Sequence, residues 1–138
     1  MTAECLFCSF AQGVFPADMV LEDEKAFAIL DIHPSAPGHT LIIPRAHYEE
    51  IKDIGPDTAQ ALFEILGRVI AALKNTLHAE GFTIGFNYGH AAGQGMPHLH
   101  VHVIPRFAGD GGGSLHTIVS TPSPEPLAAL AKRLREGL

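Results

Sequence analysis

The chain has 138 residues, 46% hydrophobic and 17% charged, which fits a single compact domain and excludes a disordered or collagen-like protein. Its 15 acidic and 9 basic residues give a net charge of −6, which argues against a nucleic-acid partner, because such proteins present a basic patch to phosphates. No apolar run is long enough to span a membrane and no signal peptide is recognisable, so we expect a cytoplasmic protein without a membrane partner.

The first third of the chain predicts a short helix and three strands. Residues 3–11, which precede Gly13 and Pro16, are expected to form a helix that carries both cysteines. Residues 20–22 and 26–30 flank an acidic turn and predict a β-hairpin. Residues 40–43, which are rich in β-branched side chains, predict a strand that Pro44 stops.

The longest predicted helix begins near Pro56 and ends before Gly81, which suits the left-handed position after a helix. Its apolar residues recur at spacings of three and four and define one buried stripe: Leu62, Ile65, Leu66, Val69, Ile70, Leu73 and Leu77. Strands are expected at 82–88 and 98–104, and a terminal helix at 125–138. Several connections are too short for parallel crossovers, so we predict an α+β fold with a largely antiparallel five-stranded sheet, one long amphipathic helix and short terminal helices.

Histidines alternate with aliphatic residues in segment 97–106. Successive strand side chains point to opposite faces, so two sets are expected: His98, His100 and His102 against Leu99, Val101 and Val103. The aliphatic face would pack on the long helix and leave three imidazoles in a row. Either they chelate a catalytic metal, or one is a nucleophile toward phosphorus that its neighbours orient. Chelation fits less well, because the outer two side chains would be ~13 Å apart.

This pattern resembles the motif of the histidine triad (HIT) family, His-φ-His-φ-His-φ-φ with φ hydrophobic, at every position of 98–104. The resemblance is strongest over 5–106 and includes 31–44 as a second block and Asn87 with Gly93-Gln94 as a third. The tail, 107–138, carries little family signal. The resemblance implies a single HIT domain over 1–138 and the activity of a nucleotide hydrolase or transferase.

The resemblance also implies a role for each matching residue. His100 would be the nucleophile that attacks the α-phosphate, the carbonyl of His98 would fix its tautomer, and His102 would contact the phosphate. The residues that match nucleotide contacts are Asp31 at the ribose, Ile32 at the base, and Asn87, Gly93 and Gln94 around the phosphate. His39 matches a histidine next to the triad. Outside the family pattern, these would be ordinary turn and loop residues.

Two positions near the third block depart from the pattern or have no match in it. Relatives often carry Ser or Thr after the glutamine, where a hydroxyl can assist the leaving group, but this chain has Gly95. The loop histidine His90 has no assigned role. The leaving group and the preferred substrate are therefore left open.

Cys5 and Cys8 form a Cys-x-x-Cys pair in a chain without other cysteines. The resemblance to microbial relatives with this start implies a structural zinc site that His47 and His98 complete, a chemically sound set of two thiolates and two imidazoles. The alternative is two reduced structural cysteines.

The leading hypothesis is a homodimeric hydrolase that cleaves a purine nucleoside 5′-phosphate derivative, such as AMP-phosphoramidate, through a nucleotidyl-histidine, with no cofactor needed for the chemistry. The alternatives are a dinucleoside polyphosphate hydrolase (for example of diadenosine tetraphosphate), a metalloenzyme built on the three histidines, and a non-catalytic nucleotide-binding protein. An exposed sheet edge invites pairing with a second copy, and the expected interface lies near Gly85, Phe86 and the helix 62–77.

Overall fold

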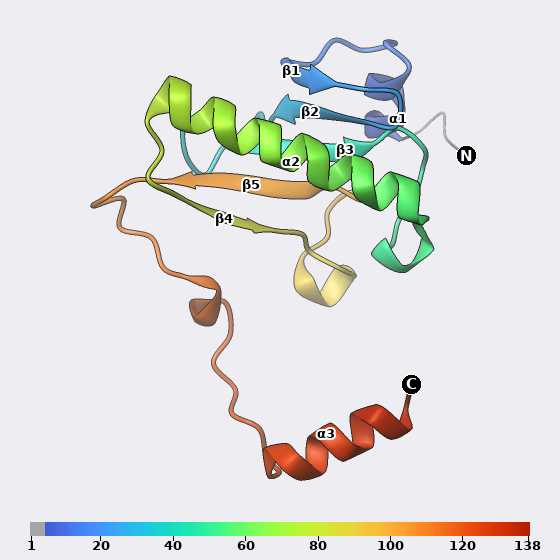
Figure 1. The fold of residues 1–138 in the computed structure, drawn as a ribbon, viewed down its shortest axis with the longest axis vertical. Helices are drawn as coiled ribbons and strands as arrows, with labels where there is room; N and C mark the ends of the chain where they lie inside the picture. The colour runs from blue at the N-terminus through green and yellow to red at the C-terminus, as the bar shows by residue number, and fades with distance from the viewer. Residues whose placement is uncertain (1–4) are drawn as a thin grey trace.

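A computed structural model describes residues 5–138, and its five strands form one sheet of order β1-β2-β3-β5-β4 with antiparallel neighbours (Figure 1). The strands are β1 (Met19–Glu22), β2 (Ala26–Leu30), β3 (Thr40–Pro44), β4 (Gly81–Gly85) and β5 (Val101–Arg106). The helices are α1 (Leu6–Ala11), α2 (Pro56–Leu77) and α3 (Leu127–Glu136), with short 3₁₀ turns η2 (Ile51–Asp53), η3 (His90–Ala92) and η4 (Leu115–Thr117). The predicted α+β fold is confirmed.

Both faces of the sheet are covered, and alternate residues of β2 show how. Ala26 and Ala28 belong to the core under α2, where their small side chains let the helix approach the sheet. Phe27 and Ile29 belong to a second core on the opposite face, together with α1. The α2 core is completed by Ile42, Ala61, Leu62, Ile65, Val69, Leu73, Leu99 and Val103. The predicted stripe of α2 is therefore largely buried, although Leu77 at its end is partly exposed.

Helix α2 ends earlier than the glycine rule predicts. His78, and not Gly81, takes the left-handed conformation after the helix (φ 58°), and its N–H donates to the carbonyl of Lys74. Histidine is one of the residue types that tolerate this region, so glycine is not required there. Gly81 is instead the first residue of β4.

Several strand boundaries also differ from those expected: β1 begins one residue earlier, at Met19, and β5 ends two residues later, at Arg106. Pro44 is the last residue of β3 and pairs with Ala26, because the ladder ends there and needs no N–H from it. β4 ends at Gly85 instead of residue 88. β5 begins at Val101 instead of residue 98, because the N–H of Leu99 donates to the carbonyl of Tyr48 outside the sheet.

The two ends of the chain form short helices, as expected. Helix α1 begins at Leu6, so Cys5 is its N-cap and Cys8 lies within it; residues 3 and 4 of the expected helix lie outside the described residues. At the other end, the chain after β5 runs past β4 and ends in α3, which stands apart from the sheet and buries none of its residues (Figure 1). We call residues 107–138 the arm. No helix in the range 5–138 is long and apolar enough to cross a membrane.

The turn before β3 requires glycine at position 38. Gly38 has φ +86°, and a Cβ there would lie 2.7 Å from a methyl group of Leu73 and 2.7 Å from one of Leu77. The turn can therefore pack under the C-terminal end of α2, which fixes the residue that follows, His39, at the start of β3.

Candidate active site

Three histidines gather where β5 begins, on the face of the sheet opposite α2. Nδ1 of His100 lies 2.8 Å from the carbonyl oxygen of His98. Because a carbonyl only accepts, Nδ1 carries the proton, and the neutral ring presents its lone pair at Nε2. Phe7 of α1 packs edge-on against this ring, with 5.1 Å between centroids, and holds its orientation. The neutral form of His100 would thus present an unprotonated Nε2 to the adjacent cavity.

A second chain of hydrogen bonds sets the tautomer of His102. The backbone N–H of Ser35 donates to Nδ1 of His39 (3.0 Å), so a neutral His39 carries its proton on Nε2. That Nε2–H donates to Nδ1 of His102 (2.9 Å), which leaves the proton of a neutral His102 on Nε2. His102 can then offer one N–H to a ligand.

The imidazoles of His39 and His102, which form this chain of hydrogen bonds, are both held neutral. Burial lowers the pKa of His39, against the opposing effect of the Asp31 carboxylate. Burial also lowers the pKa of His102 to about 4, with further lowering by His100 and His39. The face that carries the histidines therefore bears little positive charge at neutral pH.

Asp31 lies beside this chain, with Oδ2 3.5 Å from Nε2 of His39 and 4.0 Å from Nδ1 of His102. These three groups are close enough together to surround a metal ion. A metal on Nε2 of His39 would require a proton on Nδ1, which would then face the N–H of Ser35. We therefore assign the group as a hydrogen-bond network. The other oxygen of Asp31 accepts the N–H of His33 (2.9 Å).

A cavity of about 380 Å³ lies between α1, the end of β2 and the histidines. Its walls are mainly apolar, and its polar end contains Asp31, His100 and His102. Ile32 also lines it and is 76% exposed, so a planar ligand could cover it. Among the residues expected to contact a nucleotide, the structure thus brings Asp31 and Ile32 together with two triad histidines.

The remaining residues of that set lie elsewhere. Asn87 lines a separate cavity that also reaches His39 and His102. Gln94 closes its own loop: its oxygen accepts the N–H of Gly89 (2.9 Å), and its amide donates to the carbonyls of Glu49 (3.2 Å) and Met96 (3.1 Å). Gly93 takes a left-handed conformation (φ 90°) in that loop. In the described part of the chain, neither Gln94 nor Gly93 lines the two histidine cavities.

Cys5, Cys8, His47 and His98 form a second cluster, in which one ligand atom from each lies within 4.8 Å of the others. Nδ1 of His98 is 3.3 Å from Sγ of Cys5 and 3.5 Å from Sγ of Cys8, and Nδ1 of His47 is 3.4 Å from Sγ of Cys8. In a tetrahedral zinc site the sulfur–nitrogen separation is about 3.6 Å. The donor set and its spacing therefore fit a closed four-ligand zinc site.

The orientation of His98 fits a cation in this cluster, and Cys8 would need that cation in order to ionise. Nε2 of His98 lies 2.8 Å from the carbonyl of Pro44 and donates to it, so the lone pair of Nδ1 faces the sulfurs. Burial, and then the adjacent Cys5 thiol, raise the pKa of the Cys8 thiol to about 11, so a thiolate there needs a compensating positive charge. Because both nitrogens of His98 have these partners, the three triad histidines do not converge on one metal ion.

Three further residues belong to the site although no sequence motif marks them. Ser35 contributes through its backbone N–H and Pro44 through its carbonyl, and neither contact depends on a side chain. Phe7 lies between the two cysteines and contacts both His98 and His100. Phe7 stands inside the Cys-x-x-Cys segment. If the helix that carries this segment is placed on the histidine face of the sheet, a contact between Phe7 and the histidines can be expected.

Comparisons with known proteins agree with this geometry. The model of the HIT domain family matches residues 12–109. The structure resembles the crystal structure of a HIT family member from Bacillus subtilis (31% identical, 98% of this chain and 97% of that chain, TM-score 0.84) and a Zn-bound histidine triad family protein from Mycobacterium smegmatis (33%, 100% of each chain, 0.74). Adenylylsulfatase HINT3 of Arabidopsis thaliana is 34% identical over 75% of this chain and 52% of its own length.

Acidification is expected to destabilise the fold partly through His102. Its pKa is about 4 in the folded chain and near 6.5 when unfolded, so the unfolded state binds more protons between these values and the free energy of unfolding falls as the pH falls. The free energy of unfolding can be measured in urea at about pH 7 and at about pH 4.5. Between these two pH values it should fall by roughly 1–3 kcal/mol less in His102→Asn than in the wild type. His90→Asn, in an exposed loop, should lose as much as the wild type. If the free energy of unfolding fell equally in all three proteins, the lowered pKa of His102 would be contradicted.

Proposed function

Because this chain belongs to the histidine triad family, we propose that it is a hydrolase that transfers the nucleotidyl group of a purine nucleoside 5′-phosphate derivative to His100 and then to water. The observation that carries the proposal is the 2.8 Å hydrogen bond from His100 Nδ1 to the His98 carbonyl, beside a cavity that Asp31 and His102 also line. The name adenylylsulfatase, borne by the Arabidopsis relative, supports chemistry at an adenylyl phosphorus.

The reaction has two displacement steps. Nε2 of His100 forms a bond to the α-phosphorus while the bond to the leaving group breaks, and that bonding pair goes to the leaving atom, which takes a proton from solvent. Water then attacks the phosphorus, the P–N bond breaks, its pair returns to Nε2, and one proton is released. Nδ1 keeps its proton throughout, so the His98 carbonyl stabilises the positive charge of the intermediate.

The neighbouring residues bind and orient the substrate. The Nε2–H of His102 donates to a phosphate oxygen, as the tautomer chain from Ser35 and His39 requires. The Asp31 carboxylate accepts the ribose hydroxyls, and Ile32 covers one face of the base. Asn87 approaches the phosphate from the neighbouring cavity. Gln94 and Gly93 would contribute indirectly, by stabilising the loop that ends at Pro97. The hydrogen bonds of Gln94 are all with this loop and with Glu49.

We also propose that Cys5, Cys8, His47 and His98 bind one structural zinc ion. The donor set, its spacing and the Zn-bound relative support this assignment. Zinc would supply folding energy and anchor α1 to the sheet, and it takes no part in the two displacement steps. The two cysteines are free and buried, a state that fits a reducing, cytoplasmic location.

A homodimer that pairs β4 with its counterpart completes the proposal. β4 is an edge strand, and all its residues are half-buried. Helix α2 makes most of its contacts with β1, β2, β3 and β5, and Phe82 and Ile84 of β4 pack only at the margin of its core and stay partly exposed. On the outer side of α2, Phe63 is 74% exposed, which is unusual for a large apolar side chain. A second copy would cover both features.

His100→Ala is expected to lower kcat for AMP-phosphoramidate by roughly three orders of magnitude or more, because it removes the nucleophile. AMP binding should survive, because the cavity walls remain. Wild-type protein mixed with substrate and quenched in alkali should gain the mass of an AMP group, and the variant should not. The matched control is His90→Ala, which should turn over at the wild-type rate. Turnover by His100→Ala at the wild-type rate would reject the proposal. Measuring kcat/KM of the wild type for diadenosine tetraphosphate as well would show which of the two substrates is preferred.

Purified protein is expected to contain about one zinc ion per chain. Chelation should lower the melting temperature by roughly 5–15 °C, because the ion binds only the folded state. Cys5→Ser should have a similar effect, and chelator should then produce no further loss. The zinc site would be rejected if elemental analysis found no metal in the wild type, or if chelator left the melting temperature unchanged. Cys5 and Cys8 would then be ordinary reduced thiols.

Sedimentation at about 10 μM should find a dimer, because an open sheet edge and an exposed large apolar side chain both favour association with a second copy. Phe63→Glu should shift the protein toward monomer. Val14→Glu, at an apolar residue that is also exposed but lies near α1, should remain dimeric. A wild type that sediments as a monomer would refute this interface.

A further inference from the structure

The cavity assigned to the nucleotide runs across the sheet, and the strand register shows where its two ends lie. Ile29 of β2 pairs with Leu41 of β3, and Leu41 pairs with His102 of β5, so these three side chains form a row along the cavity. Met19 of β1 continues the row beyond Ile29. The strand β1 is thus three strand spacings from His102, which is roughly 14 Å. The histidine end and the β1 end of the cavity are therefore well separated.

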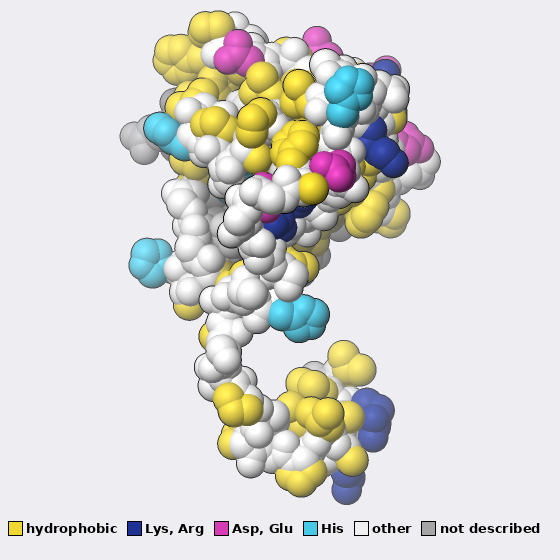
Figure 2. Space-filling view, turned by 90° about the vertical axis from the view of Figure 1, so that its left-hand side faces the viewer, with side chains coloured by type: hydrophobic (Ala, Val, Ile, Leu, Met, Phe, Trp, Pro, Cys, Tyr) yellow, Lys and Arg dark blue, Asp and Glu magenta, His cyan; other side chains and the backbone are white. Residues whose placement is uncertain are grey.

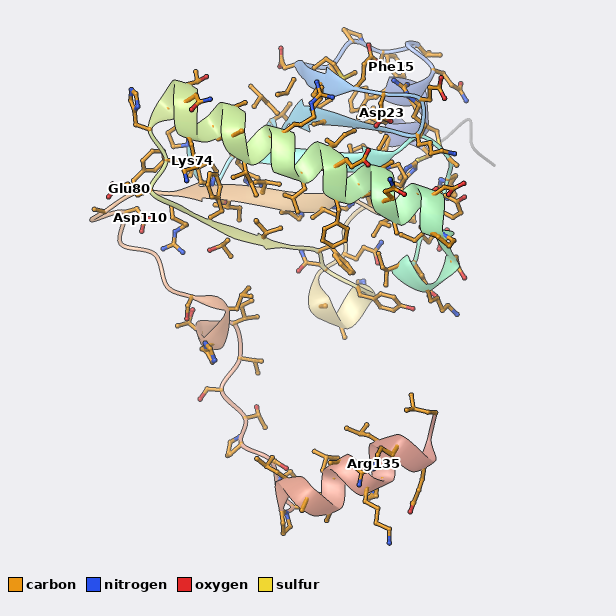
Figure 3. The ribbon with its side chains drawn as sticks, viewed as in Figure 1. Phe15, Asp23, Lys74, Glu80, Asp110 and Arg135 are labelled. Atoms are coloured by element: carbon orange, nitrogen blue, oxygen red, sulfur yellow. The ribbon has the colours of Figure 1, made fainter. Side chains whose placement is uncertain are left out.

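Asp18 lies at the β1 end of this cavity. It directly precedes β1, and its carbonyl accepts the N–H of Leu30 at the end of β2 (3.0 Å), which fixes its backbone. Its side chain lines the cavity. Figure 3 shows Phe15, in the same segment of the chain, on the opposite side of the molecule from Asp110 at the start of the arm. The β1 end of the cavity is therefore remote from the arm.

The polar side chains of the cavity are divided between its two ends. His100 and His102 lie at the phosphate end. Asp31 and His33 lie together, because the N–H of His33 donates to the Asp31 carboxylate (2.9 Å). Asp18 is the remaining polar lining residue; it is exposed, and it makes no ion pair or side-chain hydrogen bond within residues 5–138. Its carboxylate is therefore available to a ligand.

Apolar residues flank Asp18 in the chain. Val14, Phe15 and Met19 are all exposed, although each is a large apolar side chain. The space-filling view shows hydrophobic side chains gathered over the upper part of the body, the part to which β1 belongs (Figure 2). A flat aromatic ring that extends from the cavity would cover part of this apolar surface, and its polar edge would then meet Asp18.

The order of the groups along a nucleotide matches the order of the residues along the cavity. With the phosphorus at His100 and the ribose hydroxyls at Asp31, the base is the part that extends toward β1. A carboxylate can only accept hydrogen bonds. Guanine carries two donors side by side, N1–H and the N2 amino group, which match the two carboxylate oxygens as a guanidinium does. Adenine offers one amino group there, next to the lone pair of N1, which the carboxylate repels.

Resting on the proposed function, we propose that Asp18 makes the site selective for guanine over adenine nucleotides, because its carboxylate accepts hydrogen bonds from both N1–H and the N2 amino group of the base. The phosphate of the same nucleotide lies roughly 14 Å away. That distance exceeds the screening length of about 8 Å at physiological salt, so the phosphate and Asp18 repel each other only weakly. The chemistry at His100 is unchanged, and Asp18 acts only on which purine is bound.

The test compares guanosine, inosine and adenosine 5′-phosphoramidates as substrates of the full chain. Inosine keeps N1–H and lacks the 2-amino group, so it separates the two donors. The wild type should show a kcat/KM for the guanosine compound about tenfold above that for the adenosine compound, with the inosine compound between them. In Asp18→Ala the three values should become equal. Glu24→Ala is the matched control, because Glu24 is an exposed carboxylate that does not line this cavity; its ratios should stay at the wild-type values.

Binding of GMP and AMP to His100→Ala, measured by calorimetry, separates recognition of the base from the chemistry. This variant should bind GMP about tenfold more tightly than AMP, and the added Asp18→Ala change should remove the difference. A wild type without preference for the guanosine compound, or a ratio unchanged in Asp18→Ala, would overturn this inference alone. If no phosphoramidate is hydrolysed but the preference for GMP remains, the proposed function fails and the role of Asp18 in recognising the base is supported.

Discussion

The fixed position of His98 is the constraint on which the candidate site depends. Its side chain is fully buried, Nε2 donates to the carbonyl of Pro44, and Nδ1 faces the sulfurs of Cys5 and Cys8. With the ring held on both sides, its backbone carbonyl is held as well, and that carbonyl accepts the proton of His100 Nδ1. The cysteine cluster and the nucleophile are therefore coupled through one residue, although they have different chemistry.

Burial and backbone hydrogen bonds, rather than ion pairs, determine the protonation of the histidines. Ser35, Pro44 and His98 each present a backbone group whose role as donor or acceptor is unambiguous, and each fixes one imidazole. Burial lowers the pKa of His39, His98 and His102 and so favours the neutral forms that these bonds require. A phosphoryl group would then meet directed N–H donors and one lone pair.

Much of this arrangement could be predicted from the sequence, because it follows from periodicity. The alternation across residues 98–103 correctly placed Leu99 and Val103 under α2, even though β5 itself begins only at Val101. The cluster of Cys5 and Cys8 with two histidines was expected from the family resemblance. The tautomer chain from Ser35 could not be predicted, because a backbone N–H has no sequence signature. The place of Asp18 in the cavity could not be predicted either, because it depends on the register of β1 on β2, which shifts between Met19 and Leu21.

Gly38 connects the hydrophobic core to this network. The turn that contains it presents Ser35 and His39 on one side and packs against Leu73 and Leu77 on the other. Any side chain at position 38 would be strained at a φ of +86° and would displace methyl groups of Leu73 and Leu77, next to the turn that holds the imidazole bonded to His102. A substitution at this position would therefore act on the packing of α2 and, through the turn, on the proton of His102. In a library of random substitutions, residue 38 should therefore be depleted even though it touches no ligand and lies outside the triad.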